Sequence, residues 1–138
     1  MKNIEKLRKL QASIMVFTNN VYSLHWNVKG SHFFEIHEET EKLFKDLREM
    51  YDDVAEKIVM HDALPVGSYK NQLELSAIKE IETKWYDLTF ISNNVVESLG
   101  KIIELTDAVE GTNVIQPMLD EIYLKADKWR WNFRQLVK

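Results

Sequence analysis

The chain has 138 residues, of which 45% are apolar and 29% charged, enough apolar material for one domain with a buried core. It contains no cysteine, which excludes disulfides, iron–sulfur clusters, zinc–thiolate sites and a cysteine nucleophile. The formal net charge of −4 argues against nucleic acid as an obligate partner, because such binding relies on a basic surface. A cationic metal suits the excess of carboxylates better.

Neither a membrane span nor an export signal is visible in the sequence. No apolar run approaches the roughly 18 residues that a membrane-spanning helix needs. The N-terminal stretch MKNIEKLRKL is charged and lacks the apolar centre of a signal peptide. We therefore expect a cytoplasmic protein. Only four glycines and two prolines are present, which favours long helices.

Apolar residues at three- and four-residue spacing predict two long helices in the first half of the chain. The first covers about residues 3–28, and Gly30 suits its C-terminal end. Ser31 is the expected N-cap of the second helix, which runs to residue 61 or 62. The predicted seam of the first helix consists of Leu7, Leu10, Ile14, Phe17, Val21, Leu24 and Val28.

The apolar face of the second predicted helix is unusually wide. Its main seam consists of Leu43, Leu47, Met50, Val54 and Ile58. A second stripe beside it consists of Phe44, Tyr51, Ala55 and Val59. Two interpretations fit this width: a helix in the centre of its own bundle, or a helix that another subunit partly covers.

The second half of the chain predicts a short helix and two long ones. Pro65 and Gly67 mark a turn, after which Ser68 is expected to cap a short helix that ends near Leu75. The third main helix is predicted over residues 77–106 and the fourth over residues 114–137, with Pro117 in its first turn. Their inward residues are Ile81, Trp85, Leu88, Val95, Leu99 and Ile102, then Ile122, Ala126, Trp129, Phe133 and Leu136.

This order of elements predicts an all-α four-helix bundle. The long connection between the second and third main helices is the crossover that two parallel helices require. The short extra helix lies inside this crossover. No linker indicates a second domain, so residues 1–138 are expected to form one domain.

Four polar residues of the second predicted helix share one face: His37, Glu41, Asp52 and Glu56. At about 100° per residue, all four fall within an arc of roughly 100°. With a rise of about 1.5 Å per residue, His37 and Asp52 are roughly 22 Å apart along the helix, too far for one metal ion. A second copy of the helix, antiparallel and related by a two-fold axis, would bring His37 of one chain beside Asp52 of the other and create two sites.

His25 joins this set when the first two helices fold into a hairpin about Gly30 and Ser31. His25 lies six residues before Ser31 and His37 six residues after it, so both stand at the same height. One chain then contributes His25 and His37, with Glu41 as a candidate third ligand, and its partner contributes Asp52 and Glu56.

Imidazole and carboxylate together suit Fe(II), Mn(II) or Zn(II), whereas calcium and magnesium prefer oxygen ligands alone. Two simpler interpretations stay open. The histidines would then be hydrogen-bonded residues of an ordinary bundle. Asp52 and Glu56 would be a solvated pair at four-residue spacing.

The sequence resembles the Dps miniferritins, the DNA-binding proteins from starved cells, over nearly its whole length. The specific feature is an LHW motif at residues 24–26 followed by DDVAEK, which begins 27 residues after the histidine. Further matching residues are Asn27 to Gly30, Phe33, Phe34, Ile36 to Glu38, Pro65, Thr106, Asp107, Asp127, Lys128 and Trp131. The resemblance implies a ferritin-like bundle that assembles into a hollow dodecamer from two-fold dimers.

Position by position, the resemblance places the family's ferroxidase ligands on His25, His37, Glu41, Asp52 and Glu56. It assigns catalysis to all of these except Glu41, which would only bind metal. The implied reaction is oxidation of Fe(II), preferably by hydrogen peroxide, followed by storage of ferric mineral and protection against oxidative damage. Other ferritins use a Glu-x-x-His motif within one subunit, and this chain contains no such motif.

The resemblance extends less clearly to DNA. Several Dps proteins bind DNA through a lysine-rich N-terminal tail, whereas here only Met1 and Lys2 precede the helical pattern. We expect weak or absent DNA binding. The alternatives are a nucleoid-compacting protein with a secondary metal site and a helical scaffold without chemistry.

Several other residues have two interpretations each. The family pattern allows Trp26 to scavenge oxidising equivalents, but it also suits a core anchor. His61 suits the C-terminal end of a helix, or a surface metal together with Asp62. The acids that draw iron through three-fold channels in the family are reduced here to Asp107, Glu110 and Asp120.

Overall fold

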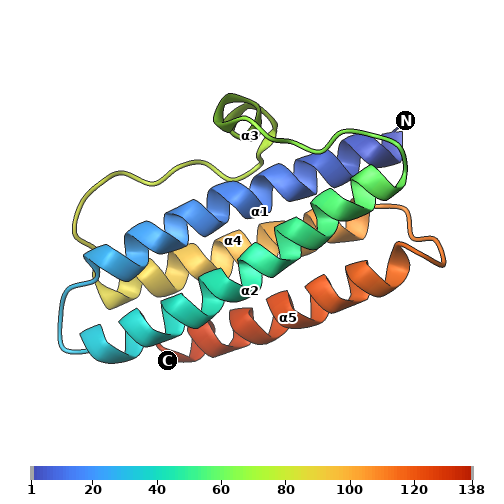
Figure 1. The fold of residues 1–138 in the computed structure, drawn as a ribbon. Helices are drawn as coiled ribbons and strands as arrows, with labels where there is room; N and C mark the ends of the chain where they lie inside the picture. The colour runs from blue at the N-terminus through green and yellow to red at the C-terminus, as the bar shows by residue number, and fades with distance from the viewer. Residues whose placement is uncertain (1, 138) are drawn as a thin grey trace.

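The computed structural model describes residues 2–137, so Met1 and Lys138 lie outside the described part of the chain. Within that part it is a bundle of four long helices and one short one (Figure 1). These are α1 (Lys2–Asn27), α2 (Phe33–Met60), α3 (Tyr69–Leu75), α4 (Leu88–Ala108) and α5 (Gln116–Gln135). The predicted all-α bundle, with a short helix in the crossover, is confirmed.

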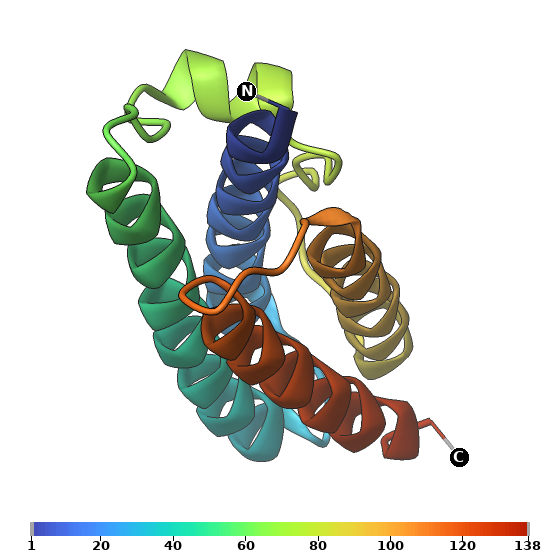
Figure 2. The same ribbon diagram turned by 90° about the vertical axis from the view of Figure 1, so that its right-hand side faces the viewer.

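The four long helices form a closed ring of contacts. α1 packs against α2 and α4, and α5 packs against the same two helices from the opposite side (Figure 2). The crossover passes outside α1 and carries α3, so that α2 and α4 run parallel (Figure 1). No helix among residues 2–137 is long and apolar enough to span a bilayer.

The predicted seams of the first two helices form the centre of the core. All seven seam residues from Leu7 to Val28 are buried, and so are the five of α2 from Leu43 to Ile58. The second stripe of α2 is covered less well: Phe44 is buried, Tyr51 and Ala55 are half-buried, and Val59 is 54% exposed. A single chain therefore leaves part of this wide face uncovered, as the second interpretation of α2 requires.

The predicted start of the third main helix is wrong, because α4 begins at Leu88 and not at residue 77. Its N-cap is Asp87, whose Oδ1 accepts a hydrogen bond from the Phe90 amide at 2.8 Å. Residues 76–87 are instead mostly extended and lie along α1, so Trp85 is 62% exposed and does not belong to the seam.

Buried polar side chains of α1 hold this extended segment. Asn20 donates to the Lys79 carbonyl at 2.9 Å and accepts from the Ile81 amide at 3.1 Å. Ser13 accepts from the Ala77 amide at 2.9 Å. These bonds satisfy backbone groups that a helix would have satisfied internally, which explains why the apolar spacing before Leu88 does not produce a helix.

The ends of the other helices are a further test of the predictions. Ser68 caps α3 by accepting from the Asn71 amide at 3.1 Å, as predicted. Gly30 has φ +122°, a conformation that favours glycine, at the predicted end of the first helix. Ser31 is not the N-cap of α2. That position is held by His32, which makes no capping hydrogen bond through its side chain.

Candidate metal centre

The α1–α2 hairpin brings His25 and His37 into direct contact. Their ring centroids are 3.8 Å apart and their planes differ by 13°. His25 lies in the last turn of α1 and is buried, whereas His37 lies in the second turn of α2 and is half-buried. The hairpin argument from Gly30 and Ser31 therefore gave the correct height for both rings.

Each ring is fixed by a hydrogen bond at Nδ1. His37 Nδ1 lies 2.9 Å from the backbone carbonyl of His25. A carbonyl oxygen only accepts, so Nδ1 of His37 carries the proton and the lone pair of the neutral ring is on Nε2. His25 Nδ1 lies 3.0 Å from the hydroxyl of Thr40. Both contacts leave the outer nitrogen of the ring as the metal-ligating atom.

The environment keeps His25 neutral near pH 7. Burial lowers the pKa of His25, and the electrostatic interaction with the neighbouring His37 lowers it further. A hydrogen bond with the His37 backbone opposes both effects and raises the pKa of His25, and the carboxylate of Glu41 raises it to a smaller extent. A neutral imidazole is the form that binds a metal ion. Glu41 itself is exposed, and its Oε2 lies 3.3 Å from Lys45 Nζ.

Asp52 and Glu56 form a second group further along α2. The negative charge of Asp52 raises the pKa of Glu56, and a hydrogen bond between the two side chains adds to this rise. Burial and the charges of Glu121, Asp52 and Glu49 raise the pKa of Asp53 in the next position. Lys125, which pairs with Glu49 and Glu121, partly offsets this charge and lowers the pKa of Asp53. Asp52 and Glu56 are nevertheless like charges held together on an exposed face, which is an arrangement that favours metal binding.

The two groups do not meet within one chain. Among residues 2–137, no three His, Asp or Glu side chains are placed to hold a metal ion together. The structure thus brings His25 and His37 together and sets Glu41 near them. Asp52 and Glu56 lie beside each other toward the other end of α2, away from the two histidines. The donor types, two imidazoles and three carboxylates, fit a transition metal such as iron.

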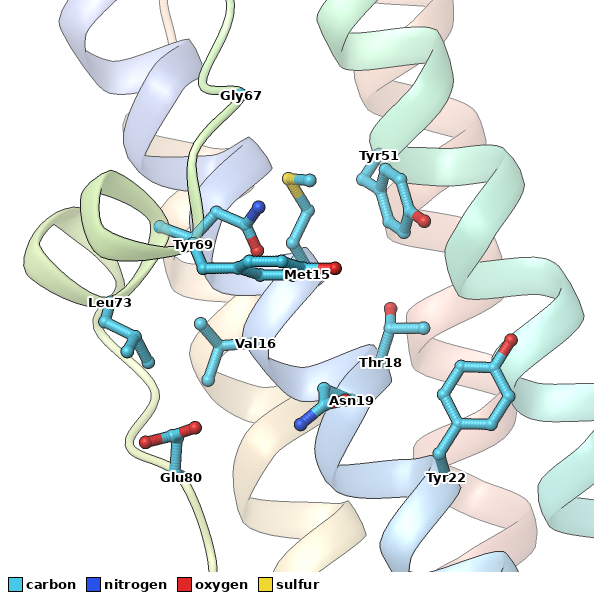
Figure 3. Close-up of a pocket in the computed structure, with 11 residues that line it drawn as sticks. Met15, Val16, Thr18, Asn19, Tyr22, Tyr51, Gly67, Tyr69, Leu73 and Glu80 are labelled. Carbon is cyan, nitrogen blue, oxygen red and sulfur yellow. The ribbon is translucent and has the colours of Figure 1, made fainter.

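A groove of about 570 Å³ lies between α1, α2 and α3 (Figure 3). Tyr22 and Tyr51 line it from the two helices that carry the candidate ligands. Tyr69 of α3 is 85% exposed and lines the groove together with Met15 (Figure 3). The groove lies on the helices that carry the candidate ligands, and both apolar and polar side chains line it.

Sequence reasoning missed this groove and the role of Thr40. The only signal for Thr40 is its position three residues after His37, on the same side of the helix. Trp26 is 63% exposed, so the interpretation as a core anchor is wrong for the single chain. His61 donates from Nδ1 to the Lys57 carbonyl at 2.8 Å, which confirms its expected role at the end of α2.

The expected channel acids lie around the α4–α5 connection. Asp107 and Asp120 line one small cavity there, and Asp120 Oδ1 accepts from the side chain of Gln116 at 2.7 Å. The backbone of Glu110 is held by two hydrogen bonds to the side chain of Asn3. Asp107 thus lies at the end of α4, Glu110 in the loop and Asp120 in the first turns of α5, and the hydrogen bond from Gln116 already uses part of the accepting capacity of Asp120.

Comparisons with known proteins agree with this architecture. Residues 4–138 match the ferritin-like domain. The DNA protection during starvation protein of Helicobacter pylori is 33% identical over 141 residues, covering 95% of each chain.

Two crystal structures are also similar. The first is the Vibrio cholerae Dps protein, described as a member of a broad superfamily of ferritin-like diiron-carboxylate proteins. It has a TM-score of 0.81 at 26% identity, over 99% of this chain and 89% of its own. The second is Listeria monocytogenes Dps, with a TM-score of 0.83 at 29% identity, over 98% and 92%. The chain therefore belongs to the ferritin-like family, as a miniferritin of the Dps type.

Proposed function

We propose that this protein oxidises Fe(II) at sites formed between two copies of the chain and stores the ferric product inside a hollow shell. The observation that carries the proposal is the division of the ligands. His25 of α1 and His37 of α2 form one incomplete site, and Asp52 and Glu56 form another further along α2. Membership of the Dps miniferritins supports iron as the metal.

A two-fold axis that crosses α2 between His37 and Asp52 completes both sites at once. The antiparallel partner then places its Asp52 and Glu56 beside His25, His37 and Glu41. The partly uncovered stripe of α2 and the groove at Tyr22 and Tyr51 lie on the face that this partner would cover. We further propose that such dimers assemble into a dodecamer, as the family resemblance implies.

The residues would bind Fe(II), and the bound Fe(II) would supply the electrons for the redox reaction. The carboxylates of Glu41, Asp52 and Glu56 bind Fe(II) and offset its charge, while the neutral imidazoles complete the ligand set. Two Fe(II) ions supply the two electrons that reduce one hydrogen peroxide, and two protons complete the formation of two waters. Paired oxidation of this kind avoids the one-electron step that would release hydroxyl radical. Oxygen is the alternative oxidant.

The names of the relatives point to protection of DNA, and we infer that this protein protects it by removing Fe(II) and peroxide. The net charge of −4 disfavours tight binding to a polyanion. We keep the cytoplasm as the proposed location, where protection of DNA would be needed. A gel-shift assay with plasmid at physiological salt should show little or no retardation, whereas tight binding would favour a nucleoid-compacting protein.

The direct test adds Fe(II) and hydrogen peroxide to the purified protein and follows ferric absorbance. We expect rapid oxidation by the native protein and a large loss of rate in His25→Ala/Asp52→Ala. A matched control, His32→Ala/Asp127→Ala, removes an exposed residue of each type away from the proposed ligands. Equal rates in the native protein and the His25/Asp52 variant would contradict the site assignment.

A further inference from the structure

Thr40 is a fully buried polar residue that contacts both histidine-bearing helices. It lies on α2, and its hydroxyl is 3.0 Å from Nδ1 of His25 on α1. The same hydroxyl lies 2.6 Å from the Ile36 carbonyl and 3.2 Å from the His37 carbonyl. Three possible partners therefore surround one hydroxyl group.

The direction of these hydrogen bonds follows from the atoms involved. A threonine hydroxyl has one hydrogen, and both carbonyls can only accept it. The shorter contact indicates that this hydrogen is donated to Ile36. The oxygen of Thr40 is then left to accept a hydrogen from Nδ1 of His25. The neutral His25 ring is thereby held in the tautomer that has its lone pair on Nε2.

His37 is held in the same tautomer by an independent contact, because its Nδ1 donates to the His25 carbonyl at 2.9 Å. The two rings thus share one protonation pattern while they are stacked at 3.8 Å. Metal-ligating histidines typically donate their other ring N–H to a fixed acceptor, which sets both the tautomer and the ring orientation. In this chain the acceptors are a backbone carbonyl and the hydroxyl of Thr40.

We propose that Thr40 is a positioning residue that fixes the tautomer and orientation of His25, leaving Nε2 free to bind a metal ion. The effect of Thr40 on metal binding rests on the proposed function. The tautomer of His25, in contrast, is a property of the metal-free protein. The competing explanation is that Thr40 is an ordinary buried threonine that bonds back to its own helix.

The chain offers a matched control for that explanation. Thr106 is buried on α4 and donates to the Ile102 carbonyl at 2.8 Å, the same four-residue back-bond that Thr40 makes to Ile36. No histidine contact accompanies it among the described residues. Replacement by valine removes the hydroxyl at either position and keeps the shape of the side chain. Only the change at residue 40 also removes the hydroxyl that accepts from His25, and it leaves the His37 backbone as the remaining hydrogen-bond partner of that ring.

The experiment compares the native protein with Thr40→Val, Thr40→Ser and Thr106→Val. Imidazole ¹⁵N NMR of the metal-free protein reports the tautomer, and calorimetric titration with Zn(II) reports metal affinity. We expect a protonated Nδ1 on His25 in the native protein and in Thr40→Ser and Thr106→Val. Thr40→Val should alter this pattern and weaken Zn(II) binding by about 10- to 100-fold.

Several results would overturn the inference. A native His25 protonated at Nε2 would do so without any variant, which keeps the test decisive if Thr40→Val fails to fold. An unchanged tautomer and Zn(II) affinity in Thr40→Val, or equal losses in Thr106→Val, would also contradict it. If the native protein bound no metal while the expected tautomers were present, the proposed function would fail and the positioning role would be limited to the ring itself.

Discussion

At the scale of single residues, the candidate ligands are held in the state that metal binding needs. Burial keeps His25 neutral, and hydrogen bonds at Nδ1 leave Nε2 of both histidines available. Asp52 and Glu56 repel one another in the metal-free protein. The metal-free state thus carries unfavourable electrostatics that a cation would relieve, a common trade between stability and function.

This repulsion predicts that Glu56→Gln stabilises the metal-free protein while it impairs iron oxidation. The raised pKa means that the folded state of Glu56 binds protons more tightly than the unfolded state does. The Glu56 carboxylate therefore destabilises the folded protein most above its folded-state pKa, as at pH 7. This destabilisation disappears at low pH, where the carboxyl is protonated in both the folded and the unfolded protein.

Thermal unfolding at pH 7 and at about pH 3.5 should show a higher melting temperature for Glu56→Gln only at the higher pH. Glu74→Gln, which changes an exposed residue of α3, is the control. A variant that is no more stable than the native protein at pH 7, or that oxidises iron at the native rate, would contradict the role given to Glu56.

At the scale of helices and connections, local signals predicted most of the fold. The apolar seams of α1 and α2 and the Ser68 cap of α3 depend on nearby residues, so the sequence pattern was sufficient. The start of α4 depends on Asn20 and Ser13, which are more than 50 residues away in the sequence from the segment that they bind. No periodicity in residues 76–87 could reveal those partners.

The candidate site likewise has features that local sequence predicts and features that depend on distant contacts. Hairpin arithmetic predicted the contact of His25 with His37, because it needed only the position of the turn. The contribution of Thr40 was missed because it depends on distances between two helices. The meeting of both half-sites remains a prediction, since it requires a second chain.

The crossover predicts a specific cost for Asn20→Ala. The side chain is buried and satisfies the Lys79 carbonyl and the Ile81 amide. Losing it leaves two part-buried backbone groups without partners, at about 1–3 kcal/mol each when fully buried, so we expect a loss of about 2–4 kcal/mol in unfolding free energy.

Urea denaturation of the metal-free protein measures this loss. Asn19→Ala is the matched control, because Asn19 is the neighbouring residue and is exposed. Similar stabilities for the two variants would show that Asn20 does not hold the segment that leads to α4.

At the scale of the whole molecule, a single chain leaves apolar surface exposed beside its candidate ligands. Tyr69 is the most exposed of the large groove residues, and the partly covered stripe of α2 continues the same face. Apolar patches of this kind commonly mark interfaces between proteins. The proposed two-fold partner would cover this surface and complete the sites in one step.

This arrangement predicts that Tyr69→Asp weakens assembly. A carboxylate placed in an apolar interface must lose its hydration without gaining a partner. Lys70→Asp, the adjacent exposed residue of α3, introduces the same acid without lining the groove. Native mass spectrometry of the metal-free proteins should show smaller species for Tyr69→Asp and native assembly for Lys70→Asp. Native assembly in both would place the interface elsewhere.

The central claim is that each site takes its histidines from one chain and its acids from another. It is tested most directly by mixing two inactive chains, His25→Ala and Asp52→Ala, through co-expression with different tags and tandem purification. In a mixed dimer one site carries both changes and the other carries neither. Each variant alone should oxidise Fe(II) slowly.

In a dodecamer with random pairing, half of the dimers are mixed and each regains one of its two sites, so the co-assembled protein should recover about one quarter of the native oxidation rate. Recovery near that level would support the shared sites. If the co-assembled protein were no faster than the separate variants, the ligands would not be divided between chains and the account would be wrong.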